Sequence, residues 1–462
     1  RVHRSYRPPP LESGKVASML NRLLIILVAI ALLALSPTLA SAQSSTAPAD
    51  DLVEILVRPG GQRTLIPLAV PDVRVSGGAS NDELAGLGDL MRRCFRIAGY
   101  FEVLGPDRYF FDPSRDGLDP AQMNFQNWFN VGAQAVVRGR IELTAGGQAV
   151  VDYRLYDVTG RTQIDVGFGP RTVPVDRVRG ETYAFINAVV LYFSGSPGIF
   201  GQRIAFGARG RGGTKQIFTI RTDGSDLSGV TSGDTIHLFP AWGPGGAVMY
   251  TSYANDNPDL WIGSGRSART LSSQPGLNMG ARLSPDGSEI AIALTLRGNA
   301  DIFILSASGE ILRQCTTSAA EDISPTWSPD GSRIAFVSDR AGGPQIFVMN
   351  RDCSGQRRVT FRGSYNTNPD WSPLGDAIAF TGRAGNRYDI FTVEPDSGRI
   401  ERITQDQGSN TNPSWSPDGR YLVFASSRGG GGNRLYISTA DGQSQTLITP
   451  NVSGVESPAW QR

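Results

Sequence analysis

The C-terminal half of the chain alternates short apolar runs with turn-forming residues, and the unit around Trp327 is typical. Ser-Pro-Asp-Gly at 328–331 places serine first, proline second and glycine fourth, which is the residue set of a type I turn. The apolar runs 334–337 and 345–349 flank a second turn at 342–344 and are rich in β-branched and aromatic residues. The unit is therefore predicted to consist of short antiparallel strands joined by tight turns.

This unit recurs down the chain at a nearly constant interval. The tryptophan position is occupied in turn by Trp242, Leu283, Trp327, Trp371, Trp415 and Trp460, at intervals of 41, 44, 44, 44 and 45 residues. Each interval holds a Pro-x-Trp strand, an Ile-Ala-Phe strand, a Gln-Ile-Phe strand and a short strand ending in an apolar residue plus Thr or Ser. Six repeats of four strands predict a six-bladed β-propeller.

The phase of the repeat predicts how the ring closes. The first repeat opens at Arg203 without a Pro-x-Trp strand, and the last strand, Glu456 to Trp460, has no repeat of its own. We expect this last strand to be the innermost strand of the first blade, which would leave no free sheet edge.

The preceding part of the chain predicts a small α/β domain with a mixed or antiparallel sheet. Strands are expected at 53–57, 64–70 and 101–104, and a Gly146-Gly147 turn predicts a hairpin. A capping box at 80–83 opens a helix whose apolar residues follow helical spacing: Leu84, Leu87, Met91, Phe95 and Ala98. A shorter helix is expected to bury Phe125, Trp128 and Phe129, and Asp176 is expected to cap a last helix.

The start of the chain has the pattern of a secretory signal peptide. Asn21 and Arg22 precede the apolar run 23–35, and Ala40-Ser41-Ala42 has the spacing of a cleavage site. The run is short for a membrane span, so a soluble, exported protein that begins at Gln43 is expected. The predicted organisation is an upstream extension and signal peptide at 1–42, an α/β domain with a mobile leading segment at 43–194, and the propeller at 200–462.

Composition and charge narrow the function classes. The formal net charge of +1 gives no bulk electrostatic reason to expect nucleic acid or an anionic membrane as partner. The 55 glycines and 29 prolines fit a turn-rich β protein. Cys94 and Cys315 fit buried apolar positions, while Cys353 takes a glycine-type turn position; an oxidising compartment permits a Cys315–Cys353 disulfide, but spacing alone leaves this open.

Residues for catalysis are scarce. The sequence has no Gly-x-Ser-x-Gly elbow, phosphate loop or dinucleotide fingerprint. Beyond the predicted cleavage site, His237 is the single histidine, and its position before a Pro-x-Trp strand favours partner contact or a solvated loop over catalysis. No catalytic, cofactor or metal residues are predicted.

The loops before the Pro-x-Trp strands vary between repeats and should open together at the mouth of the central channel. Variable loops on a fixed scaffold indicate a recognition surface. Tyr365 either anchors a partner or packs on its own blade. The predicted partner contacts are His237, Leu238, Leu277, Asn278, Met279, Asp322, Ile323, Tyr365, Asn366, Asn410 and Thr411.

The Trp-Ser-Pro-Asp-Gly turns resemble the propeller repeats of the TolB family and of some propeller-bearing peptidases and lyases. Together with the predicted signal peptide, the α/β domain and the Gly-x-x-Gly-x-Phe junction at 195–200, the whole mature chain resembles TolB, the periplasmic component of the Tol-Pal system. One departure is the helix 183–193, which lacks the His and Asp expected in that family.

The resemblance implies a non-enzymatic adaptor that supports outer-membrane integrity and invagination during cell division. It implies that the propeller face docks the lipoprotein Pal, that bacteriocins exploit the assembly, and that the mature N-terminus engages TolA. The N-terminal residues concerned are Gln43, Asp50, Asp51, Leu52 and Val53. The alternative is an exported propeller hydrolase or lyase acting on peptide or polysaccharide, which the scarcity of catalytic residues disfavours.

Overall fold

The computed structural model describes residues 64–78, 82–210, 212–296, 298–449 and 451–462. The predicted signal peptide, the strand at 53–57, the N-terminal partner segment and the first residues of the predicted capping box lie outside this range. None of the helices in the described residues is long and apolar enough to cross a membrane.

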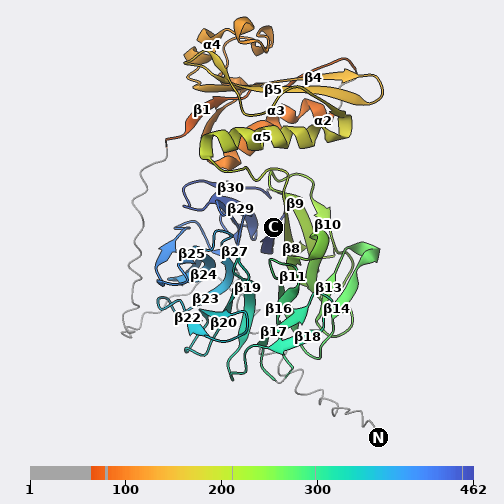
Figure 1. Ribbon diagram of the computed structural model, residues 1–462, viewed down its shortest axis with the longest axis vertical. Helices are drawn as coiled ribbons and strands as arrows, with labels where there is room; N and C mark the ends of the chain where they lie inside the picture. The colour runs from red at the N-terminus through yellow and green to blue at the C-terminus, as the bar shows by residue number, and fades with distance from the viewer. Residues whose placement is uncertain (1–63, 79–81, 211, 297, 450) are drawn as a thin grey trace, which may run out of the picture. The chain divides into compact units, whose positions relative to one another are not determined.

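The first group of elements forms a mixed sheet, as expected (Figure 1). Strand β1 (Ile66–Ala69) lies between β3 (Phe101–Leu104) and β4 (Ala135–Thr144) and runs parallel to both. Strand β5 (Gln148–Asp157) is antiparallel to β4 across the predicted glycine turn. The shorter strands are β2 (Arg74–Ser76), β6 (Thr162–Ile164) and β7 (Arg171–Pro174).

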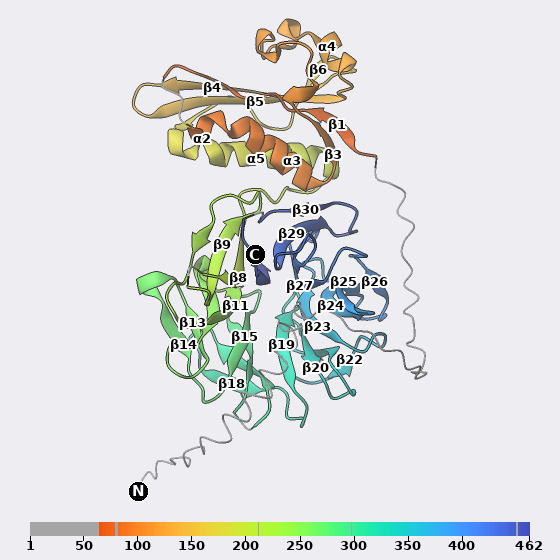
Figure 2. The same ribbon diagram turned by 180° about the vertical axis from the view of Figure 1, so that it is seen from behind.

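Helices α3 and α5 lie side by side along one face of this sheet (Figures 1 and 2). All five apolar residues of the first predicted helix are buried, which confirms its inward face. Two details are wrong: Phe129 is 60% exposed, and α5 begins after Arg177 without a side-chain cap from Asp176. The helices are α2 (Asp82–Ala85), α3 (Leu87–Ala98), α4 (Phe125–Asn130) and α5 (Val178–Ser194), with 3-10 turns η1 (Pro106–Arg108), η2 (Pro113–Arg115), η3 (Pro120–Gln122) and η4 (Val175–Arg177).

The remaining strands form six four-stranded antiparallel sheets, which confirms the six-bladed propeller. Blade 1 consists of β8 (Arg203–Arg209), β9 (Lys215–Arg221), β10 (Ser228–Gly229) and β31 (Glu456–Trp460); blade 2 of β11 (His237–Trp242), β12 (Val248–Ser252), β13 (Asp259–Ile262) and β14 (Arg269–Ser272); blade 3 of β15 (Asn278–Leu283), β16 (Glu289–Leu294), β17 (Asp301–Ser306) and β18 (Ile311–Gln314). Blade 4 consists of β19 (Asp322–Trp327), β20 (Arg333–Ser338), β21 (Gln345–Asn350) and β22 (Arg357–Arg358); blade 5 of β23 (Asn366–Trp371), β24 (Ile378–Ala384), β25 (Arg387–Val393) and β26 (Ile400–Arg402); blade 6 of β27 (Asn410–Trp415), β28 (Tyr421–Ser426), β29 (Arg434–Thr439) and β30 (Gln445–Leu447). Short 3-10 turns η5 (Pro244–Gly246) and η6 (Gly265–Ser267) lie within blade 2.

The ring closes as the phase of the repeat predicts. Strand β31 pairs antiparallel with β8, with Trp460 opposite Ile204 and Glu456 opposite Gly207. Because β31 also contacts the innermost strands β11 and β27 of the two neighbouring blades, the two ends of the propeller sequence meet in one sheet. No edge of blade 1 is left open toward the channel.

Two of the repeat tryptophans join neighbouring blades by a hydrogen bond as well as by their size. Trp371 instead donates to Gly375 of its own blade, and the indole nitrogen of Trp415 has no hydrogen-bond partner among the described residues. The indole N–H of Trp327 donates to the carbonyl of Arg282 in blade 3 at 3.1 Å, and that of Trp242 donates to Ala459 in blade 1 at 2.9 Å. Leu283 fills the same position in blade 3 without such a bond. Burial and a polar contact therefore both contribute at this position.

The predicted Ser-Pro-Asp-Gly turn is held by its own side chains. The hydroxyls of Ser328 and Ser332 donate to the Asp330 carboxylate at 2.5 and 2.7 Å. These hydrogen bonds lower the pKa of Asp330 to about 2. Gly331 takes a φ of 68°, a left-handed conformation that glycine adopts without strain.

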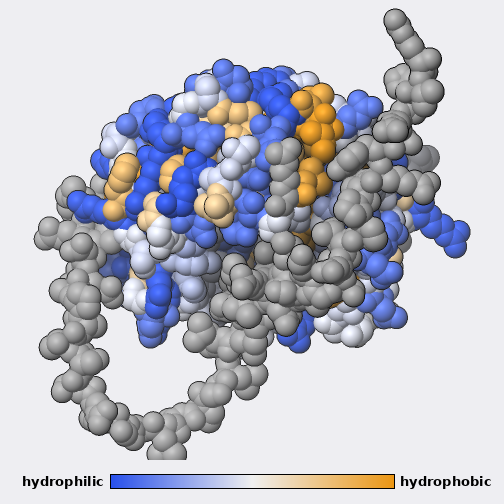
Figure 3. Space-filling view, turned by 90° about the horizontal axis from the view of Figure 1, so that it is seen from below, coloured by the Kyte–Doolittle hydropathy of each residue, from blue (hydrophilic) through white to orange (hydrophobic). Residues whose placement is uncertain are grey.

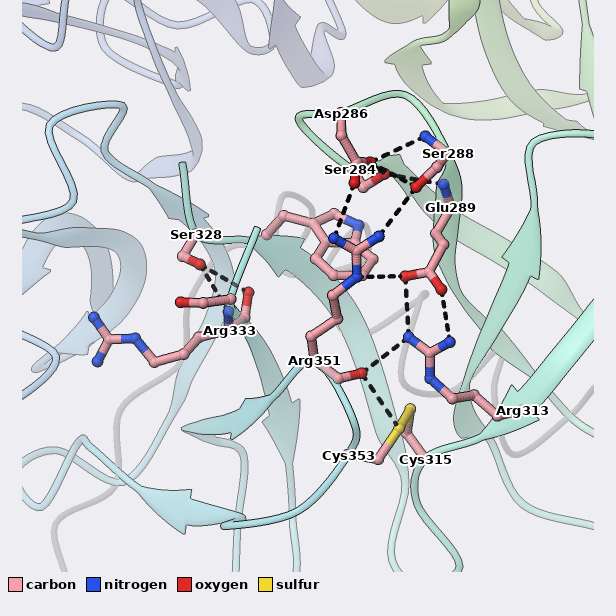
Figure 4. A network of polar contacts seen from close by, with 12 residues as sticks. Ser284, Asp286, Ser288, Glu289, Arg313, Cys315, Ser328, Arg333, Arg351 and Cys353 are labelled. Atoms are coloured by element: carbon pink, nitrogen blue, oxygen red, sulfur yellow. Dashed lines mark hydrogen bonds and ion pairs between the residues drawn. A yellow bond between two sulfur atoms is a disulfide. The ribbon is translucent and has the colours of Figure 1, made fainter. Parts of the chain in front are cut away.

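Blades 3 and 4 are also joined by a disulfide and an arginine cluster (Figure 4). Cys315, just after β18, is bonded to Cys353, in the turn between β21 and β22, at an S–S distance of 1.95 Å. The Arg351 guanidinium lies between Asp286 and Glu289 of blade 3, 2.9 Å from each carboxylate, and Figure 4 shows it above the disulfide. The Cys315–Cys353 disulfide, which the sequence left open, is therefore formed. Cys94 is buried and is not part of a disulfide.

The α/β elements and the propeller share one hydrophobic core. Residues of α3, α5, blade 1 and blade 6 belong to the same buried cluster, and the Tyr421 hydroxyl donates to the Ala98 carbonyl at 3.0 Å. The described residues form one compact unit, so the domain boundary at 194–200 stays a prediction.

Candidate functional site

The antiparallel strand order brings two sets of loops to the mouth of the channel. In each blade the start of the innermost strand pairs with the end of the second strand, as Asp322 pairs with Ser338 and Asn410 with Ser426. The turn between the second and third strands therefore lies beside the loop that precedes the innermost strand. We call these two sets together the mouth face; they comprise 231–239, 273–280, 317–324, 361–368, 405–412 and 451–457, with the turns 253–258, 339–344, 383–387 and 427–433.

Each innermost strand carries a bulge at the same point. At the bulge, pairing with the second strand is interrupted and then resumes next to the tryptophan position. In all six blades the residue two positions before it resumes has a left-handed backbone, with φ between 47° and 69°. These residues line a cavity of about 40 Å³ in the channel: Phe239, Gly280, Ser324, Asn368, Asn412 and Ser457. A pocket for a small-molecule substrate is typically about 300–1,000 Å³. The channel at this level is therefore too narrow for one.

Five of the eleven predicted partner contacts are buried in the described structure. They occupy the first position of an innermost strand. All of them except His237 make side-chain hydrogen bonds there to their own blade, to the loop before the strand or to the preceding blade. Asn410, for example, donates to Asp389 and accepts from Arg428, both at 3.0 Å. Their side chains offer a partner almost no contact area: His237, Asn278, Asp322, Asn366 and Asn410 are at most 8% exposed.

His237 has no partner for acid–base chemistry. Its ring lies edge-on to Tyr250 at 5.3 Å, and its Nδ1 atom has no hydrogen-bond partner among the described residues. Burial lowers the pKa of His237, which favours the neutral ring. Nothing in this arrangement resembles a nucleophile–base pair.

The other six predicted contacts are partly exposed on the mouth face. Tyr365 stacks edge-on against Tyr388 of its own blade at a ring distance of 5.6 Å, and burial raises its pKa. Part of the tyrosine surface is therefore used for packing, and the rest faces solvent. The six residues are Leu238, Leu277, Met279, Ile323, Tyr365 and Thr411.

Charge is unevenly distributed around the mouth face. The exposed charges near blades 2 to 4 are mainly aspartates, with Arg340 as an exception: Asp234, Asp256 and Asp339. The exposed charges near blades 5, 6 and 1 are mainly arginines, with Asp406 as an exception: Arg209, Arg362, Arg383 and Arg387. Sequence reasoning missed Arg209, Arg383 and Arg387 because it considered only the loops before the Pro-x-Trp strands. The antiparallel order of the predicted strands would have placed the second set of turns on the same face.

Large apolar side chains are also exposed away from the mouth face. The surface seen in Figure 3 is mostly hydrophilic and carries a few hydrophobic groups. On β18, at the outer edge of blade 3, Ile311 is 39% and Leu312 51% exposed. In the described residues no group of three or more His, Cys, Asp or Glu side chains could hold a metal ion.

Two family models match the chain. The TolB beta propeller domain covers residues 192–462, and the TolB amino-terminal domain covers residues 53–164. The first of these alone spans more than half of the 462 residues.

Individual relatives agree with the family models. A Tol-Pal system protein TolB from Anaeromyxobacter dehalogenans strain 2CP-C is 39% identical over 311 residues, 66% of this chain and 67% of that protein. One from Desulfosudis oleivorans is 36% identical over 257 residues, 55% of this chain and 58% of the relative. The crystal structure of TolB from Acinetobacter baumannii superposes with a TM-score of 0.72 at 26% identity, over 86% of this chain and 97% of that one. From its fold, its repeats and these matches, the chain belongs to the TolB family.

Proposed function

We propose that the chain is a periplasmic, non-enzymatic adaptor of the Tol-Pal system, which docks the lipoprotein Pal on its mouth face. Its N-terminal segment would engage TolA, and the assembly would support outer-membrane integrity and invagination during division. The family membership supports the assignment to the Tol-Pal system, and the partly exposed surface of the mouth face supports its role as the docking site. Bacteriocins that compete for the same face are part of the same proposal.

The observation that carries the docking proposal is the row of partly exposed apolar residues on the mouth face of blades 2, 3 and 4. Leu238, Met279 and Ile323 come from three successive blades and sit at the same position of their innermost strands. A specific interface buries about 800 Å² on each partner, more than a single short loop offers. A partner must therefore touch several blades at once.

The uneven distribution of charge on the mouth face would fix the orientation of a bound partner. A partner with a basic end and an acidic end would dock in one rotational setting around the channel axis, because the opposite setting would bring like charges together. We expect association to slow at high salt, because the exposed arginines and aspartates act over a Debye length of about 10 Å at 0.1 M salt.

The proposal is tested by capturing partners from an envelope extract with the mature chain and identifying them by mass spectrometry. We expect Pal and TolA, with Pal lost from a Leu238→Asp variant and TolA lost from a variant that lacks residues 43–53. Loss of both partners from either variant would contradict the proposal that Pal and TolA bind at separate sites. Capture of neither by the native chain would contradict the proposed function.

A further inference from the structure

The residue directly before the tryptophan position of each innermost strand differs in chemistry from blade to blade. In sequence order these residues are Ala241, Arg282, Thr326, Asp370, Ser414 and Ala459. Arg282 lines the channel cavity, and Asp370 contacts Thr326 of the preceding blade at 3.5 Å. The two charged residues of this set, Arg282 and Asp370, therefore belong to the same channel.

The carboxylate of Asp370 is already used by other groups. Its Oδ2 atom accepts from the Arg462 guanidinium at 2.6 Å and from the backbone N–H of Trp415 at 2.7 Å. The Arg462 guanidinium also donates to the Trp371 carbonyl at 3.1 Å. Asp370 thus balances Arg462, which follows the closing strand β31.

Arg462 and Arg282 are the two cations of the channel, and Arg282 has no carboxylate as an ion-pair partner of its own. Its one hydrogen bond goes to the carbonyl of the adjacent Ala281 at 3.0 Å. Among the described residues, no carboxylate lies within ion-pair distance of it. Burial lowers the pKa of Arg282, the nearby charge of Asp370 raises it, and Arg462 lowers it again, so Asp370 is shared between two guanidinium groups. A guanidinium nevertheless stays charged in proteins, so a positive charge is held in the channel.

We propose that the cavity beside Arg282 binds one small inorganic monoanion, of which chloride is the simplest. Four donors of the guanidinium remain for such an ion, since one of five is used by Ala281. The cavity of about 40 Å³ offers the room. About 10–15 Å³ of such space holds one water molecule, so a single small ion fits beside the guanidinium.

The anion would stabilise the closed ring. A partly buried charge without an ion-pair partner destabilises a fold, and an ion bound to the native state offsets this by mass action. Asp370 and Arg462 act electrostatically on Arg282, so the ion would help to hold blades 3 and 5 and the end of β31 around the channel.

The test is the melting temperature of the whole mature chain at constant ionic strength, with chloride exchanged for gluconate. We expect the melting temperature of the native chain to rise with the logarithm of chloride concentration. Arg282→Met, which removes the charge and keeps most of the volume, should abolish the dependence and melt higher than the native chain in gluconate. Arg282→Lys should keep a weaker dependence.

Three outcomes would overturn the proposal. The first is a native chain with the same melting temperature in chloride and gluconate. The second is an Arg282→Met variant that responds to chloride as the native chain does, which would place the ion elsewhere. The third is a crystal grown in bromide without an anomalous peak beside the Arg282 guanidinium. A peak there that is lost in Arg282→Met would support the site directly.

Discussion

In five of the six blades a threonine at the end of the outer strand binds that strand to the third strand at the mouth end; blade 2 has Ser272 at this position. In these five blades the threonine hydroxyl accepts the N–H of the third strand's first apolar residue at 2.8 or 2.9 Å. In blade 5 the hydroxyl of Thr404 also donates to Asp389, which in turn accepts from Asn410 of blade 6. The threonine of the recurring apolar-Thr pair in the sequence therefore serves as a hydrogen-bond acceptor for the third strand.

We expect Thr404→Val to destabilise the protein by about 1–3 kcal/mol, because the Ile390 N–H would be buried without an acceptor. Thr411→Val is the matched control, since Thr411 is partly exposed on the mouth face and should change stability little. Chemical denaturation of both variants gives the comparison. Equal midpoints for the two would contradict the role of Thr404.

Sequence reasoning at this scale succeeded for most apolar residues, with Phe129 as an exception, and failed for several polar ones. Helical spacing identified Leu87 and Met91 as core because burial of apolar surface follows periodicity. Asn278 and Asn410 were predicted as partner contacts because they belong to loops that vary between the repeats. The structure buries both, since each satisfies backbone or side-chain groups that come from elsewhere in the sequence.

At the scale of elements, a disulfide and a cluster of ion pairs together join blades 3 and 4. The disulfide closes a sequence separation of 38 residues, and the Arg313 and Arg351 guanidinium groups both bind Glu289. Hydrogen bonds from these arginines lower the pKa of Glu289, which keeps it ionised.

We expect the double variant Cys315→Ala, Cys353→Ala to lose about 2–4 kcal/mol of stability, because its unfolded chain is less constrained. A reductant should destabilise the native chain by a similar amount and leave the double variant unchanged. Denaturant midpoints with and without reductant provide the measurement. A native chain insensitive to reductant would mean that the disulfide contributes no stability.

The sequence could not decide this pairing because it depends on distance between blades. The phase of the repeat placed Cys315 at an apolar position and Cys353 in a turn, but it gave no relation between them. Their Cα atoms lie 4.9 Å apart because the outer strand of blade 3 runs beside the last turn of blade 4.

At the scale of the whole molecule, the closing strand joins the two ends of the ring. The fold class, blade number and closure were all predictable, because six copies of one pattern reinforce each other and the phase leaves one strand unpaired. The contact between the α/β elements and the propeller was expected only in outline, since its polar contacts, such as Tyr183 with Asp223 at 3.1 Å, join distant residues.

Removal of residues 456–462 should open blade 1 and leave Asp370 without the Arg462 guanidinium that pairs with it. We expect a lower melting temperature and aggregation, because the edge of β8 would be exposed. Thermal melting and light scattering check both effects. A truncated chain as stable and as soluble as the native one would contradict closure by β31.

The central claim is that a Tol-Pal partner binds the mouth face across several blades. Its most direct measurement is a calorimetric titration of the mature chain with the soluble domain of Pal, for the native protein, Leu238→Asp and Leu312→Asp. Leu312 is an exposed leucine on the outer edge of blade 3 and is the matched control. We predict at least about tenfold weaker binding for Leu238→Asp, equivalent to about 1.4 kcal/mol, with native affinity for Leu312→Asp and unchanged melting temperatures. Native affinity for Leu238→Asp, or equal losses in both variants, would contradict the account.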